Sequence, residues 1–93
     1  MSVLVLISYD ICDARRRYRV ARLLQAHGVR VQYSVFEAHL ERPALERLRH
    51  RMRDLLDLER DSVRFYNLGE SFERRVDVEG QGELYLEPES VIV

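Results

Sequence analysis

The fold is decided by the stretch VLVLISYDICDA, residues 3–14. The first seven of these residues are mostly apolar and β-branched, without a regular alternation of apolar and polar side chains. This composition predicts a central strand that is buried on both faces. Polar residues then break the strand, and Asp13 is a suitable N-cap for a helix that begins near Ala14.

This first helix is predicted to have an apolar face and an opposite basic face, because its residue types repeat with helical spacing. The apolar face carries Val20, Leu23, Leu24 and His27, and the basic face carries Arg15, Arg19 and Arg22. Gly28 follows His27 and is predicted to occupy the C′ position that ends the helix.

The next segment is extended, but its apolar positions change from odd to even numbers between residues 29–35 and 36–40. The change predicts a bulge or a tight reversal near Gln32–Val35, so we expect two short strands that meet there. Pro43 fits the first turn of a second helix. The apolar stripe of that helix is Leu45, Leu48, Met52, Leu55 and Leu56.

The remaining sequence predicts further extended segments. Asp61–Leu68 is expected to be a strand that ends at Gly69, with additional strands at Phe72–Val78 and Leu84–Val93. The order β-α-β-β-α-β predicts an α+β, ferredoxin-like sandwich with extra C-terminal strands. We expect one domain over residues 1–93, in which 1–69 form the core and 70–93 contact a second copy or a partner. The sheet would carry helices on one face only, which favours a homodimer.

Composition limits the class of protein. The chain has 93 residues, of which 46% are apolar, and this excludes a disordered chain. The longest apolar run, Val3–Ile7, is far shorter than the about 20 residues of a membrane span. A single cysteine excludes an internal disulfide framework. No basic segment resembling a signal peptide precedes the apolar run, so we expect a soluble, cytoplasmic protein without a membrane partner.

The charge is distributed unevenly. All fifteen basic residues are arginine, and residues 1–64 hold thirteen of them against nine acidic residues, although the net charge is only −1. Arginine binds phosphate through planar, bidentate hydrogen bonds, so this surplus is compatible with a nucleic-acid partner. A general preference for arginine over lysine, combined with solvated helix faces, would give the same composition.

Asp10 is the first candidate for chemistry. It follows a buried strand, and the ends of strands present ligand-binding groups to solvent. Asp10 is therefore a candidate metal ligand or general base. The alternative is that it only caps the turn before the helix, but Asp13 is better placed for that purpose.

The run Arg15-Arg16-Arg17 is the second candidate. Cations in the first helical turn oppose the helix macrodipole, so three of them indicate a bound anion. Helical spacing lets Arg16 and Arg17 point towards the strand end at Asp10. The alternative is that one of them pairs with Glu37 or with an acidic residue across a dimer interface.

Several short motifs together resemble the CRISPR-associated protein two family, the small subunit of the spacer-acquisition complex. The motifs are Tyr9-Asp10-Ile11, Arg16-Arg17, Ala21-Arg22-Leu23-Leu24, Gly28, Gln32-x-Ser34-Val35-Phe36-Glu37 and Asp61-Ser62-Val63-Arg64-Phe65-Tyr66. The resemblance spans nearly all of residues 1–69. Toxin-like ribonucleases of the virulence-associated protein D type share the architecture and are the alternative family.

The resemblance implies a ferredoxin-like homodimer in which Asp10 meets its symmetry mate as catalytic residue and ligand of Mg²⁺ or Mn²⁺. Such proteins are described as metal-dependent endonucleases on RNA or duplex DNA, and they bridge dimers of a larger integrase subunit. The expected nucleic-acid contacts are Arg15, Arg16, Arg17 and Arg19, supported by Tyr9, Ser34 and Phe36. Cys12 replaces the residue usual after Ile11, and we expect it to loosen the turn beside Asp10.

Two functions of different classes remain open from the sequence. One is a metal-dependent phosphodiesterase, slow because no conventional general base lies near Asp10. The other is an adaptor that binds duplex DNA through arginine and docks the integrase, which we favour as the cellular role. A ferredoxin-like regulatory dimer with a small ligand is a third interpretation. Single-stranded RNA also remains a candidate substrate, because backbone contacts by arginine do not distinguish bases.

Overall fold

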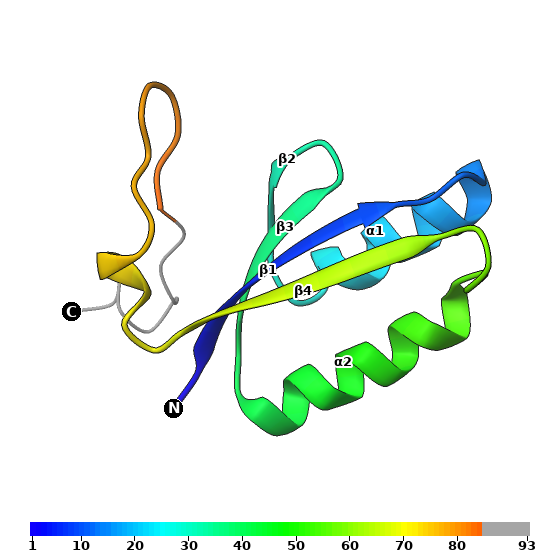
Figure 1. Ribbon diagram of the computed structural model, residues 1–93, viewed down its shortest axis with the longest axis horizontal. Helices are drawn as coiled ribbons and strands as arrows, with labels where there is room; N and C mark the ends of the chain where they lie inside the picture. Colours follow the sequence, from blue (N-terminus) through cyan, green and yellow to red (C-terminus); the bar gives the residue numbers. More distant parts are fainter. Residues whose placement is uncertain (85–93) are drawn as a thin grey trace.

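The computed structural model describes residues 1–84 and confirms the predicted order of strands and helices (Figure 1). Its elements are β1 (Val3–Asp10), α1 (Ala14–Gln25), β2 (Val29–Gln32), β3 (Val35–Leu40), α2 (Arg42–Leu55), β4 (Ser62–Gly69) and the short 3-10 helix η1 (Phe72–Arg74). None of the helices in residues 1–84 is long and apolar enough to cross a membrane.

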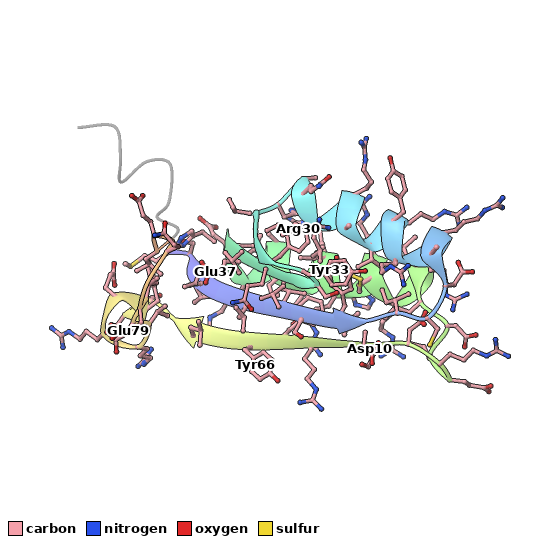
Figure 2. All side chains as sticks on the ribbon, turned by 90° about the horizontal axis from the view of Figure 1, so that it is seen from above. Asp10, Arg30, Tyr33, Glu37, Tyr66 and Glu79 are labelled. Carbon is pink, nitrogen blue, oxygen red and sulfur yellow. The ribbon has the colours of Figure 1, made fainter. Side chains whose placement is uncertain are left out.

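The four strands form one sheet in the order β2-β3-β1-β4, and each neighbouring pair is antiparallel. Both helices cover the same face of this sheet (Figure 2). This is the ferredoxin-like α+β sandwich that the sequence predicts. β1 lies inside the sheet because its apolar side chains are buried on both faces along most of its length.

Alternate residues of the strands form the core beneath the helices. Val5 pairs with Ala38 and Ile7 with Phe36, so these side chains share the face that α1 and α2 cover. The helices contribute the apolar stripes that were predicted for them, including the buried Leu24, Leu48 and Met52. The intervening residues of the strands therefore point away from the helices, and Asp10 is one of them.

Where the apolar positions change from odd to even numbers, the structure has both a register shift and a tight reversal, which the sequence predicted as alternatives. The pairing of β2 with β3 shifts between Arg30 and Gln32, and Tyr33 and Ser34 form the connecting turn. Ser34 adopts a φ of 65°, which a tight reversal requires and which non-glycine residues seldom adopt. Two strands that differ in parity can thus both bury their apolar side chains.

The N-terminus of α1 agrees with the prediction, and its C-terminus differs from it. The Asp13 side chain accepts a hydrogen bond from the backbone amide of Arg16 at 2.9 Å and caps α1. This hydrogen bond also lowers the pKa of Asp13. At the other end, α1 stops at Gln25, so Gly28 is not the C′ residue. Its role is spatial, because a Cβ atom there would collide with the backbone of Glu37 in β3.

The strand predicted for Phe72–Val78 is wrong. Residues 72–74 form the helix η1, which is closed by a hydrogen bond from Arg75 N to the carbonyl oxygen of Phe72 at 2.9 Å. Gly69, with a φ of 78°, turns the chain away from β4, and buried Phe72 packs its ring on His39 at 4.9 Å. A single aromatic anchor replaces strand pairing here. The predicted strand at 84–93 lies, apart from Leu84, outside the described residues.

Candidate functional site

Asp10 is the last residue of β1 and is exposed. Its neighbours Tyr9 and Ile11 are 5% and 4% exposed and belong to the core. Because both flanking side chains are buried, the side chain between them projects from the opposite face of the sheet (Figure 2). Alternation along β1 thus places a carboxylate at the end of the strand, as predicted.

A polar cavity of about 250 Å³ surrounds Asp10 on this face. It is lined by Ser8, Tyr9, Asp10, Ser62, Arg64 and Tyr66. Asp10 pairs with Ser62 across the sheet, and Ser8 pairs with Arg64, so the cavity is formed by facing positions of β1 and β4. The Arg64 guanidinium donates a hydrogen bond to the Tyr66 hydroxyl at 3.3 Å.

The three β4 residues of this cavity were not among the predicted site residues. Ser62, Arg64 and Tyr66 occupy alternate positions of β4, and that pattern in the sequence indicates a common polar face. The pattern gives no pairing partner for β4. Only the register between β1 and β4 shows that their common face is the one that carries Asp10.

The turn after Asp10 is held by a buried carboxylate, Asp61. Arg16 Nε donates to Asp61 Oδ2 at 2.7 Å, and the backbone amides of Cys12 and Asp57 donate to the same carboxylate at 3.3 and 3.0 Å. The Arg16 hydrogen bond lowers the pKa of Asp61 to about 2. The backbone amide of Cys12 is thus hydrogen-bonded in this turn, and loosening of the turn by its side chain stays a prediction.

Arg16 and Arg17 both serve this turn. Arg16 forms an ion pair, as the alternative interpretation held, but its partner is Asp61 and not Glu37. Arg17 Nη1 donates to the carbonyl oxygen of Ile11 at 2.9 Å. Both guanidinium groups thus make hydrogen bonds within the chain, and their binding to nucleic acid stays a prediction.

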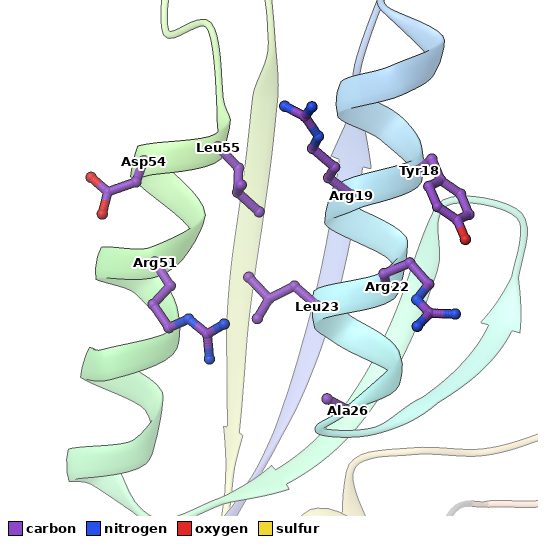
Figure 3. A pocket seen from close by; sticks show the side chains of 8 residues that line it. All are labelled: Tyr18, Arg19, Arg22, Leu23, Ala26, Arg51, Asp54 and Leu55. Carbon is purple, nitrogen blue, oxygen red and sulfur yellow. The ribbon is translucent and has the colours of Figure 1, made fainter.

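Arg15 and Arg19, the other two predicted nucleic-acid contacts, are exposed on α1. Arg19 also lines a groove of about 530 Å³ between α1 and α2 (Figure 3). The groove is lined by Tyr18, Arg19, Arg22, Leu23, Ala26, Arg51, Asp54 and Leu55. Three arginines against one aspartate make its surface basic.

The predicted supporting residues Tyr9, Ser34 and Phe36 lie at the end of β1 that carries Asp10. Buried Tyr9 stacks on Phe36 with ring centroids 6.3 Å apart, and Arg30 lies 5.3 Å above the Phe36 ring. Arg30 Nη2 also donates to the Tyr9 hydroxyl at 3.5 Å. The Ser34 carbonyl oxygen accepts from the Tyr9 amide at 3.1 Å. These residues fix the end of β1 through packing and backbone contacts.

The family model described as CRISPR associated protein Cas2 matches residues 1–76. The chain belongs to the Cas2 family. This match favours the first of the two families that the sequence motifs suggested. The chain is 46% identical over 90 residues to a protein of Synechocystis named CRISPR-associated endoribonuclease Cas2 3, and the match covers 97% of this chain and 98% of that one.

Solved structures of Cas2 proteins have the same fold. The structure of Streptococcus pyogenes Cas2 at pH 6.5 superposes with a TM-score of 0.73 at 36% identity, covering 83% of this chain and 99% of that one. A chain of a structure described as a partial Cas6-RT-Cas1–Cas2 complex superposes with a TM-score of 0.75 at 25% identity. That match covers 98% of this chain and 99% of the other. Cas2 relatives thus include a named nuclease and a complex with Cas1.

In a single copy, the described residues do not bring together the ligands of a metal site. Among residues 1–84, no group of three or more His, Cys, Asp or Glu side chains could hold a metal ion. The Asp10 cavity contains one carboxylate, and the other polar groups that line it are hydroxyls and a guanidinium. Mg²⁺ prefers several oxygen ligands, so one exposed carboxylate does not suffice.

Proposed function

We propose that this Cas2 chain acts in CRISPR adaptation as a homodimer that binds duplex DNA and bridges subunits of the larger integrase. We further propose that it is an endonuclease on RNA or duplex DNA, with Asp10 as its catalytic residue. The observation that carries the proposal is the exposed Asp10 carboxylate in a polar cavity at the end of β1, on the sheet face opposite α1 and α2.

The sheet face opposite α1 and α2 supports the homodimer. Glu37 points to this face, is only 8% exposed, and its Oε1 atom has no hydrogen-bond partner in residues 1–84. Buried carboxylate oxygens are normally satisfied, so a donor from a second copy would complete this group. On the edge strand β2, Val29 and Val31 are 41% and 39% exposed, and a second copy would cover such apolar side chains.

The basic surface of α1 supports nucleic-acid binding. Arg15 and Arg19 are exposed, and Arg19 continues into the groove with Arg22 and Arg51. Arginines along one helix can follow a phosphate backbone without reading bases. Arg16 and Arg17, which the sequence nominated with them, would act by holding the first helical turn in place.

The larger integrase subunit is proposed as the protein partner because a related fold occurs in the complex with Cas1. The contact region we propose is the segment after residue 69. Its described part lies at the end of the sheet opposite Asp10, where Figure 2 labels Glu79. A partner bound there would leave the Asp10 cavity open.

A metal ion would have to be shared between two copies. Asp10 of each copy would hold Mg²⁺ or Mn²⁺, and a bound ion would neutralise phosphate charge and lower the pKa of a bound water. The residues of this chain provide the remaining functions: Tyr9 and the Asp61-held turn orient Asp10, and the hydroxyls of Ser8 and Ser62 offer hydrogen bonds to a bound strand.

Asp10→Asn tests this proposal, because it keeps the shape of the side chain and removes its charge. Wild type and variant are compared on labelled duplex DNA and single-stranded RNA, with Mg²⁺ and with a chelator. We expect cleavage to fall by about a hundredfold or more while binding is retained. Asp77→Asn, an exposed aspartate far from the site, is the matched control.

Each arm of this experiment addresses one part of the proposal. Full cleavage in excess chelator would refute the proposed requirement for a metal ion. Full cleavage by Asp10→Asn would refute the catalytic site. DNA binding without cleavage in either protein would leave the adaptor function alone.

A further inference from the structure

Arg64 lies next to Asp10 on the sheet face opposite α1 and α2. It stands two residues beyond Ser62, which pairs with Asp10, so Arg64 and Asp10 are diagonal neighbours of adjacent strands. Such neighbours lie about 7–8 Å apart, within reach of a long side chain. Both residues line the cavity of about 250 Å³.

The guanidinium of Arg64 keeps its charge available. Its hydrogen bond goes to the neutral Tyr66 hydroxyl, and the ion pairs within residues 1–84 join other residues. Arginine is protonated at working pH in any case, and the hydrogen bond to Tyr66 raises the pKa of Arg64 further. Arg16 differs in this respect, because it forms an ion pair with the Asp61 carboxylate.

A cation at this position would favour the binding of a nucleic-acid strand at Asp10. A phosphodiester is an anion, and the Asp10 carboxylate repels it unless a positive group lies beside both. Guanidinium binds phosphate oxygens with two parallel hydrogen bonds, which also fixes the orientation of the phosphate. The cavity is several times larger than the about 30 Å³ of a water molecule, so it can admit such a group.

We propose that Arg64 binds a backbone phosphate of the nucleic-acid strand at Asp10, and that Tyr66 positions the guanidinium through its hydroxyl. The ligand is the phosphodiester chemistry common to RNA and DNA. This inference rests on the proposed function, since it names the group that brings the strand to Asp10.

The test measures binding of labelled single-stranded RNA and duplex DNA by fluorescence anisotropy, in a chelator, at about 50 to 200 mM salt. Arg64→Gln removes the charge, Arg64→Lys keeps it, and Tyr66→Phe removes only the hydroxyl. Arg42→Gln is the matched control, because Arg42 is exposed at the start of α2, next to the far end of β3. Sedimentation gives the mass of each variant, and cleavage is measured separately in Mg²⁺.

We expect Arg64→Gln to bind about tenfold or more weakly at the lowest salt. The slope of log affinity against log salt should decrease by about 0.7 per lost contact with single strands. Arg64→Lys should keep the slope, and Tyr66→Phe should weaken binding with an unchanged slope. The Arg42 control should match wild type.

Two results would overturn the assignment. One is an affinity and salt slope of Arg64→Gln equal to those of wild type. The other is a halved mass of Arg64→Gln, which would place Arg64 in the dimer interface. Failure of the proposed function looks different: wild type would not bind nucleic acid, or Asp10→Asn would cleave normally, whatever Arg64 does.

Discussion

Replacing Gly28 by alanine should destabilise the fold. Gly28 connects α1 to β2, and a Cβ atom placed on it would overlap the carbonyl oxygen of Glu37. It would also lie 2.9 Å from the Glu37 carbonyl carbon and 2.8 Å from Ala38 Cβ. Two of these three atoms belong to the backbone of β3, so they cannot rotate aside.

The size of the effect follows from opposing terms. Overpacking of a tight interior costs about 1–3 kcal/mol, and rigid backbone neighbours place Gly28→Ala in the upper part of that range. Alanine also restricts the unfolded chain, which offsets the cost by about 0.4–1 kcal/mol. A net loss of about 1.5 kcal/mol corresponds to a decrease in Tm of about 6–12 °C for a domain of this length.

The assay is urea unfolding followed by circular dichroism, at one fixed protein concentration because a dimer unfolds in a concentration-dependent manner. The double variant Gly28→Ala with Ala38→Gly removes the side-chain collision and leaves the backbone collision. We expect it to stay at least as unstable as Gly28→Ala alone. Recovery of wild-type stability in the double variant, or no loss in the single variant, would refute the backbone argument.

Two further predictions concern the turns on either side of the site. Because Asp61 has a lowered pKa, its stabilisation is complete above its ordinary pKa of 3.8 and is lost as the pH falls towards about 2. Asp61→Asn should therefore be less stable at neutral pH and should lose less stability over this interval in acid-series urea unfolding. Ser34→Asn should raise the unfolding free energy by up to about 1 kcal/mol, because asparagine tolerates the φ of 65° better than serine. Thermal unfolding checks this change, and a lower Tm would contradict it.

The local features of the fold could be predicted from the sequence because single short segments encode them. Asp13 caps α1, Pro43 lies in the first turn of α2, and the change of parity after Gln32 marks the reversal between β2 and β3. The predicted strand after Gly69 failed for a different reason. An apolar residue such as Phe72 is compatible with either a strand or a packed helical turn, and the tertiary contact with His39 decides between them.

The candidate site could be predicted only in part. Asp10 could be predicted as a site residue because a polar residue that ends an apolar strand is a local signal in the sequence. The partner of Arg16 could not be predicted, because Asp61 lies 45 residues away and no spacing rule joins the two residues. The same applies to Arg64, whose neighbourhood depends on the register of β1 with β4. Charge alone nominated the arginines of α1, whereas hydrogen bonding separates those that hold the turn from those that face solvent.

The long-range hydrogen bonds of Asp61 also bear on the order in which contacts form during folding. Its hydrogen bonds reach back 49 residues to Cys12 and 45 residues to Arg16, so the turn beside Asp10 is completed by one of the last segments of the fold. Contacts of such sequence separation form late, after the loop between them has closed. During synthesis, the first 60 residues of the chain would contain Asp10 but not Asp61, the residue that holds its turn. The turn beside Asp10 is therefore completed only in a chain that has nearly finished folding.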